Sequence, residues 1–282
     1  MHPGKFALLL AAAVTVASLL VVRGVGAAES PTAYVRFRAG DTIAYGVLKD
    51  GRITQIEGDL FGPRTPTGKT YALAQVKLLV PTQPSKVLAL AGNYKSHLAD
   101  RPTPKNPELF FKVPSCLIAT GESIVIPKGT SDVHHEGELV IVIGKRARKV
   151  KPEEAMDYVL GVTCGNDVSA RDWQKNDVQW WRAKGCDTFG PCGPAVVSGI
   201  HYDDLGLEVR VNGRVRQKQR TSDLIFGVAQ IVSFASQHLT LEPGDLIYTG
   251  TPGTTTPIQP GDVVEVELEG VGVLANPVTA EP

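Results

Sequence analysis

The sequence predicts a β-rich α+β protein, and three observations support this prediction. Short runs of apolar and β-branched residues recur between turns that contain glycine, proline or asparagine, a pattern typical of strands. The dipeptide Asp50-Gly51 lies between two such runs and is a strong hairpin signal. Residues 139–143 are apolar at every position, as in a strand buried on both faces. Only two or three segments show helical patterns.

Composition excludes several classes of protein. The 282 residues suffice for one large domain, or for one large and one small domain. An apolar fraction of 43% and a charged fraction of 21% are ordinary for a globular protein and exclude disordered and fibrous chains. Lysine plus arginine and aspartate plus glutamate both number 29, and no basic block is present. Nucleic acid and anionic membrane surfaces are therefore not expected as partners.

The N-terminal segment predicts export. Lys5 is followed by an apolar run at 6–22 and then by small residues up to Ala28. This order is typical of a secretory signal peptide at 1–28, which places the mature chain in the periplasm or outside the cell. The alternative is an uncleaved segment that tethers the protein to a membrane. In an oxidising compartment Cys186 and Cys192 could form a disulfide, although free thiols are the favoured interpretation.

The remaining chain divides near Ser85. Residues 29–84 predict a small antiparallel β domain, with strands at 33–37, 43–48, 53–56 and 76–80. Residues 85–282 form a larger domain. Its predicted strands lie at 86–90, 109–112, 123–127, 139–143, 158–163, 246–248 and 263–268. Helices are expected to begin at Pro152 and at Ser222, the second ending before Pro243.

Glu136 and Glu138 directly precede the buried run. Because strand side chains alternate between faces, the two carboxylates share one face. Two adjacent carboxylates repel each other, and a divalent cation between them is one solution; exposure of both to water is the other. Asp167 adds a third carboxylate after an apolar strand, although alone it could equally be a turn or cap residue. Such a set without cysteine or paired histidine favours Mg²⁺, with Mn²⁺ or Ca²⁺ as alternatives.

Other candidates are less specific by themselves. If residues 97–100 form a helical turn, His97 and Asp100 lie on one face, where the carboxylate would orient a general base; a solvated surface pair is the alternative. Lys184 lies in a turn-rich stretch where lysines are usually solvated. Thr251 belongs to a tight loop at 249–253 that could hold a carboxylate or could be only a turn.

The order of these motifs over about residues 86–276 resembles the fumarylacetoacetate hydrolase family. The motifs are Gly92-Asn93-Tyr94 with His97, His135-Glu136 with Glu138, Asp167 with Arg171 and Gln174, Lys184, Thr221-Ser222-Asp223, and Thr249-Gly250-Thr251-Pro252. The resemblance implies a mixed β-sandwich or roll, a homodimer, and a bound Mg²⁺ or similar ion. It assigns metal ligation to Glu136, Glu138 and Asp167. It also assigns a lid histidine to His97 with Asp100 as its partner acid, where close relatives have glutamate.

The family's substrate-contacting positions fall on Arg171, Gln174, Lys184 and Thr251. The implied reaction is metal-dependent hydrolysis of a carbon–carbon bond in an acylpyruvate or related 1,3-diketo acid. His97 would activate water positioned by Gln174, Lys184 would stabilise the enolate, and Arg171 and Thr251 would hold the substrate carboxylate. Decarboxylation or isomerisation of a 2-oxo dicarboxylic acid at the same site is the alternative. A third hypothesis is an exported protein that binds 2-oxo acids without turnover.

Overall fold

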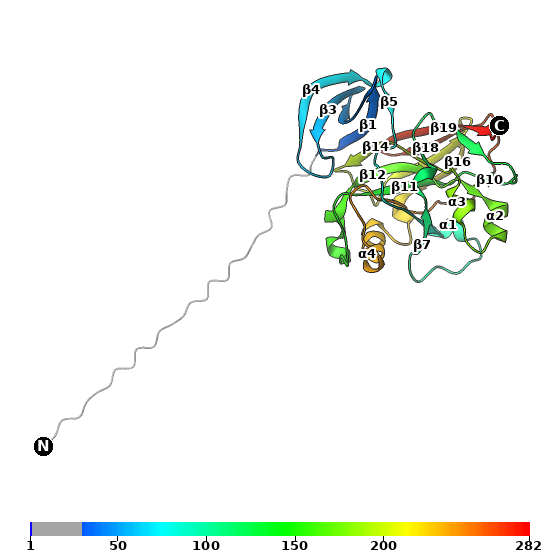
Figure 1. Ribbon diagram of the computed structural model, residues 1–282. Helices are drawn as coiled ribbons and strands as arrows, with labels where there is room; N and C mark the ends of the chain where they lie inside the picture. Colours follow the sequence, from blue (N-terminus) through cyan, green and yellow to red (C-terminus); the bar gives the residue numbers. More distant parts are fainter. Residues whose placement is uncertain (2–29) are drawn as a thin grey trace.

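The computed structural model describes residue 1 and residues 30–282 (Figure 1). Apart from Met1, the expected signal peptide lies outside the described residues, so export and tethering stay predictions. Within the described ranges, no helix is both long and apolar enough to cross a membrane.

A twelve-stranded sheet organises residues 30–282. Its strand order is β4-β3-β2-β1-β14-β12-β11-β17-β6-β7, with β5 paired to β1 and β8 paired to β14. The bounds are β1 (Thr32–Ala39), β2 (Thr42–Lys49), β3 (Arg52–Gly58), β4 (Arg64–Ala72), β5 (Lys77–Leu78), β6 (Val87–Ala91), β7 (Glu108–Lys112), β8 (Leu117–Ile118), β11 (Gly137–Ile143), β12 (Val159–Asn166), β14 (Gly190–Ser198) and β17 (Leu246–Tyr248). Because β1 pairs with β14, the N-terminal β unit continues the sheet of the larger domain.

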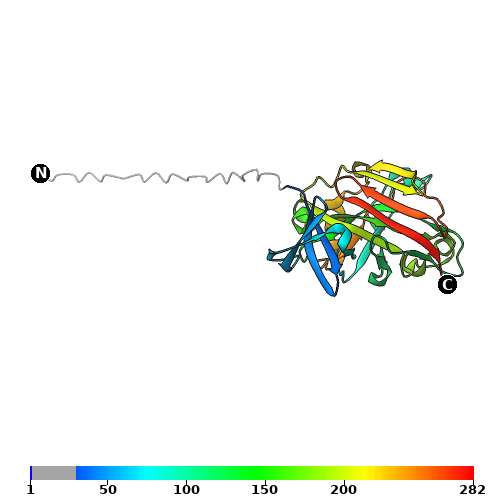
Figure 2. The same ribbon diagram turned by 90° about the horizontal axis from the view of Figure 1, so that it is seen from above.

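A second sheet of five strands packs on the first. Its strands, in spatial order, are β16 (Arg214–Arg220), β15 (Gly206–Val211), β18 (Val263–Leu268), β19 (Gly272–Ala280) and β9 (Ile124–Ile126). Strands β11, β12 and β14 contact this sheet, and Figure 2 shows β18 and β19 in orange and red beside the green strands. A short pair, β10 (Val133–His134) and β13 (Ser169–Ala170), lies next to the site described below. The β-rich sandwich expected from the sequence is confirmed.

Strand β11 is the centre of the core. All seven of its residues are buried. Leu139, Ile141 and Ile143 pack into one apolar cluster, whereas Val140 and Val142 pack into a second. The prediction of a strand buried on both faces is therefore confirmed, and the residues at its start are fixed by packing from two sides.

Helical structure in the described ranges is limited to short segments. The α-helices are α1 (Lys95–Leu98), α2 (Arg171–Asn176), α3 (Trp181–Gly185) and α4 (Val228–His238), and the 3₁₀ helices are η1 (Leu73–Gln75), η2 (Pro114–Cys116), η3 (Pro152–Tyr158) and η4 (Thr221–Asp223). The helix expected from Ser222 begins six residues later. Asn93 binds the intervening segment, because its backbone carbonyl accepts Ile225 N–H and its side-chain oxygen accepts Phe226 N–H. All four cysteines are free, so no bridge joins Cys186 and Cys192.

Candidate active site

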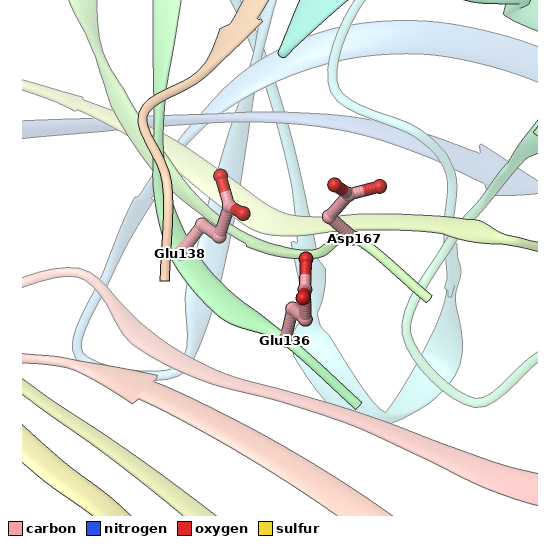
Figure 3. A group of neighbouring side chains, drawn as sticks. All are labelled: Glu136, Glu138 and Asp167. Carbon is pink, nitrogen blue, oxygen red and sulfur yellow. The ribbon is translucent and has the colours of Figure 1, made fainter. Parts of the chain in front are cut away.

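Three carboxylates meet at the ends of two paired strands. Glu136 precedes β11, Glu138 lies in it, and Asp167 follows β12; the strands are in register with Gly137 opposite Asn166. One ligand oxygen from each carboxylate lies within 4.8 Å of the other two. Figure 3 shows the three side chains close together above the strand ends. All are buried, with exposed fractions of 4%, 1% and 0%. We call these three residues the acid cluster.

Two members of the acid cluster are paired with cations. Lys184 Nζ donates to Glu136 Oε2 at 2.7 Å and to Asp167 Oδ2 at 2.6 Å. Arg171 donates to the other oxygen of Glu136. Burial by itself would raise the pKa of Glu136, but Lys184 and Arg171 hold that pKa well below its ordinary value. Glu136 is therefore ionised near neutral pH.

Glu138 differs from its neighbours. Its Oε2 accepts Gly250 N–H at 2.6 Å, and no salt bridge joins it to a cation among the described residues. Burial, followed by the charges of Asp167 and Glu136, raises its pKa well above the ordinary value. A buried all-oxygen set in which one carboxylate lacks a counter-charge fits a hard divalent cation.

The two histidines before the acid cluster have other partners. His135 is fully buried, and its ring nitrogens meet Gln217 Oε1 and Thr256 Oγ1. Burial lowers the pKa of His135 to about 4, so its ring is neutral near pH 7. His134 contacts Asp132 and Thr255. The candidate metal group formed by the described residues contains neither histidine.

A cavity of about 230 Å³ borders the acid cluster through Glu136. The predicted site residues on its wall are His97, Glu136, Arg171, Gln174, Lys184 and Thr251. Two further cations, Arg101 and Lys175, also line it. Residues that are up to 154 positions apart in the sequence, from His97 to Thr251, therefore share one small space. The structure brings together most of the residues that the sequence singled out.

The orientation of His97 favours a role as base. Its Nδ1 lies 2.6 Å from Gly253 O, while Nε2 lies 3.8 Å from Glu136 Oε1. A backbone carbonyl can only accept a hydrogen bond, so Nδ1 carries a proton, and in the neutral ring the lone pair is on Nε2. Ser96 helps to hold α1 in place, because its hydroxyl donates to Gln219 Oε1 and accepts Gly253 N–H.

Asp100 is not brought to His97. Helix α1 ends at Leu98, and Ala99 has a φ of 49°, so the helical spacing assumed for residues 97–100 does not exist. Asp100 is exposed, and no contact between the two side chains is present in the described part of the chain. The Gly253 carbonyl takes the position expected for the partner acid. The predicted His97–Asp100 pair is therefore wrong for this conformation.

Two predicted substrate-binding groups are partly engaged by the protein itself. Gln174 Oε1 accepts a hydrogen bond from Arg171 at 2.8 Å, so its NH₂ group is the part left for a ligand. The Thr251 hydroxyl donates to Gly137 O at 2.9 Å and accepts from Gln217. A substrate carboxylate at Thr251 would therefore meet its backbone N–H rather than its hydroxyl proton.

Lys112 and Gln217 were missed by sequence reasoning. Lys112 is 2% exposed and contacts Asp167. Gln217 is 4% exposed and links Gly137 N–H at the start of β11 to Pro252 O. Both lie on strands where polar residues usually face water. The one available signal was that Lys112 shares a strand face with Phe110, and this signal does not identify which face is buried.

Comparison with known proteins agrees with this geometry. Residues 86–279 match the family described as fumarylacetoacetate (FAA) hydrolase C-terminal, and residues 33–81 match the family described as Rv2993c-like, N-terminal. Protein Rv2993c of Mycobacterium tuberculosis is 47% identical over 224 residues, covering 77% of this chain and 84% of that protein. Mitochondrial oxaloacetate tautomerase fahd2 of Xenopus laevis is 40% identical over 220 residues, covering 73% and 69%.

Solved structures extend the likeness to most of the chain. The 2-hydroxyhepta-2,4-diene-1,7-dioate isomerase of Mycobacterium marinum has a TM-score of 0.84 at 41% identity, covering 89% of this chain and 99% of that one. Maleylpyruvate hydrolase of Sphingobium sp. SYK-6, in complex with manganese(II) and pyruvate, has a TM-score of 0.74 at 29% identity, covering 89% and 100%. The matched domain contains the acid cluster and every residue that lines the cavity, and the chain belongs to the fumarylacetoacetate hydrolase family.

Proposed function

We propose that this protein is a metal-dependent enzyme that interconverts the keto and enol forms of a small dianionic 2-oxo acid. One observation carries the proposal. A single cavity combines Glu136 of the acid cluster, the His97 imidazole and four cationic side chains, which are Arg101, Arg171, Lys175 and Lys184. A volume of about 230 Å³ suits a substrate of a few carbon atoms.

The acid cluster would hold the metal. Mg²⁺ or Mn²⁺ fits its oxygen-only donors, and Glu138 is the carboxylate that forms no salt bridge with a cation among the described residues. When bound, such an ion supplies Lewis-acid polarisation of the substrate carbonyl, which makes the neighbouring carbon more acidic.

The chain's own residues then account for the proton transfer. His97 Nε2 removes a proton from the carbon next to the carbonyl, and the C–H electron pair becomes the new carbon–carbon double bond. The carbonyl oxygen gains negative charge, which the buried Lys184 ammonium stabilises. The proton on His97 is then returned to that oxygen, giving the enol. No water is consumed, and the reverse sequence restores the keto form.

Charge at the cavity entrance supports a dianionic substrate. Arg171 and Lys184 are already paired with the acid cluster. Arg101 donates only to the backbone carbonyls of His97 and Leu98, and among the described residues no carboxylate pairs with it or with Lys175. Two cations that have no carboxylate partner in the described part of the chain are suited to bind a second substrate carboxylate.

Two further observations favour proton exchange over water attack. The carboxylate expected to strengthen His97 as a base does not contact it, and His97 Nδ1 meets the Gly253 carbonyl instead. Among the relatives, one is named an oxaloacetate tautomerase and another an isomerase.

Hydrolysis of a carbon–carbon bond in an acylpyruvate is the second candidate. It is favoured by the similarity to maleylpyruvate hydrolase, whose structure contains manganese and pyruvate. In this reaction His97 would deprotonate water held by the Gln174 amide, and the cleaved bond would leave the enolate of pyruvate. Decarboxylation of the same dianionic acid is the variant in which carbon dioxide leaves instead.

The test compares net reactions on one enzyme preparation. Oxaloacetate is supplied as its enol with Mg²⁺, Mn²⁺ or EDTA, and loss of enol absorbance is followed together with release of pyruvate; a panel of acylpyruvates is assayed in parallel. Metal-dependent enol loss without pyruvate supports tautomerisation. Pyruvate from acylpyruvates supports hydrolysis, and pyruvate from oxaloacetate supports decarboxylation. No metal-dependent acceleration with any of these acids would reject the proposal.

A further inference from the structure

A buried lysine outside the cavity contacts the acid cluster from behind. Lys112, at the end of β7, is 2% exposed and does not line the cavity. Its neighbour Phe111 is 61% exposed, so the strand places a lysine inside and a phenylalanine outside. Among residues 30–282 only one other lysine, Lys184, is buried, and both lysines bind Asp167. A charge is removed from water at this depth only where it has specific partners.

The two lysines divide the oxygens of Asp167 between them. Lys112 Nζ donates to Oδ1 at 2.7 Å, and Lys184 Nζ donates to Oδ2 at 2.6 Å. Lys184 faces the cavity, whereas Lys112 does not. If Lys184 acts on the substrate, Lys112 is the partner that keeps Asp167 in place throughout the reaction.

Lys112 also fixes the segment that carries Lys184. Its ammonium donates to the backbone carbonyl of Lys184 at the end of α3, and to Phe189 O at 3.0 Å just before β14. Phe110, on the same face of β7, lies under the Lys184 ammonium, with 5.3 Å between Nζ and the ring centroid. One strand face therefore supports both the carboxylate and the cation of the site.

We infer that Lys112 is a positioning residue, which orients Asp167 for metal binding and Lys184 for contact with the substrate. It acts from the side of the acid cluster that faces away from the cavity. Only the part that concerns Lys184 and the substrate rests on the proposed function, because the effect of Lys112 on metal binding is measured without substrate. Groups that orient metal ligands typically change metal affinity or activity by about 10- to 100-fold when they are removed.

The test uses Lys112→Met, which keeps the length of the side chain and removes its charge and donors. Lys86→Met is the matched control, because Lys86 lies next to Val87, the strand partner of Lys112, but pairs with the buried Asp245 instead of the acid cluster. Mn²⁺ affinity is measured by calorimetry without substrate, melting temperature by circular dichroism, and kcat and KM with the acid that the wild-type enzyme turns over. We expect both variants to have a lower melting temperature than the wild type. Only Lys112→Met is expected to bind Mn²⁺ more weakly, by about 10- to 100-fold.

A second variant covers the case in which Lys112→Met does not fold. Lys112→Gln keeps a hydrogen-bond donor for Lys184 O or Phe189 O without the charge, and its Mn²⁺ affinity is expected to fall in the same direction. If the Mn²⁺ affinity of the folded variant equals or exceeds that of the wild type, Lys112 supports the fold alone and the inference is overturned. Wild-type protein that binds Mn²⁺ but turns over no 2-oxo acid would reject the proposed function and leave the metal-binding comparison intact.

Discussion

The acid cluster and helix α1 are the two halves of the site, and they are held in place by different means. The acid cluster is placed by the backbone ladder between β11 and β12, which pairs Gly137 with Asn166 and continues through the core. Helix α1 has only four residues and is held by a few contacts to neighbouring segments, chiefly through Ser96 and His97. Register and burial make the first half rigid, whereas the second depends on a small number of hydrogen bonds. In the proposed mechanism, the candidate metal ligands thus lie at the edge of the core, and the base for proton transfer lies on a more adjustable element.

The largest effect on activity is expected from a substitution in the acid cluster, the rigid half of the site. Glu138→Gln should leave the metal-free protein folded, because burial and neighbouring charges raise the pKa of Glu138 and glutamine resembles its protonated form. The variant lacks one charged ligand, so activity should fall about 1,000-fold, the equivalent of roughly 4 kcal/mol of lost charge stabilisation. The rise in melting temperature on adding Mn²⁺ should shrink as well.

Thermal melting with and without Mn²⁺ checks this prediction, together with initial rates. Asp132→Asn serves as the control, because Asp132 lies near the site but contacts His134 rather than the acid cluster. Equal Mn²⁺-induced stabilisation in Glu138→Gln and the wild type would show that the metal is held elsewhere.

His97 is the key residue of the adjustable half. His97→Gln removes the base but keeps a polar side chain, and the rate of enol–keto exchange should fall about 100-fold. Mn²⁺ affinity should change little, since His97 Nε2 is 3.8 Å from Glu136 Oε1 and His97 is not part of the candidate metal group found among the described residues. Single-turnover rates and calorimetry measure the two quantities. A parent-like rate in this variant would remove His97 from the mechanism.

The rigid half was also the half that the sequence predicted best. Apolar residues at every position of 139–143 indicated a strand buried on both faces, and strand alternation placed Glu136 and Glu138 together. These inferences need only local pattern. The contact between Lys112 and Asp167 spans 55 positions and depends on how β7 meets the end of α3. No local pattern carries that information.

Several elements were missed for physical reasons that can be named. Strand β14 contains Pro191 and Pro194, and prolines argue against a central strand. It nevertheless lies between β1 and β12 in the sheet. Strand β16, with the sequence RVRQKQR, has too few apolar residues to show a buried face. At α1 the error was different: a helical turn was assumed to reach Asp100, but the left-handed backbone at Ala99 ends it.

Substitutions of the cations at the cavity entrance should have a smaller effect, which is confined to substrate binding. Arg101→Met should raise KM for a dianionic 2-oxo acid about 5- to 10-fold, because one charge-assisted hydrogen bond is lost. Lys175→Met should act in the same direction, whereas Lys49→Met, which alters an exposed lysine away from the cavity, should not. Steady-state kinetics with a dianionic and a monoanionic 2-oxo acid separate the effects. Equal changes for both acids would mean that these cations do not contact a second carboxylate.

The smallest effect is expected from Asp100. Asp100→Asn should change kcat/KM by less than about twofold, because an exposed carboxylate with no partner among residues 30–282 contributes little to its surroundings. The pH dependence of kcat/KM should also keep its shape, since the Gly253 carbonyl, not Asp100, fixes the proton on His97 Nδ1. Rate profiles of the wild type and the variant provide the comparison. A tenfold loss in Asp100→Asn would mean that α1 adopts a second arrangement during turnover, in which the carboxylate reaches the imidazole. The contrast between a rigid acid cluster and an adjustable α1 would then be part of the catalytic cycle itself.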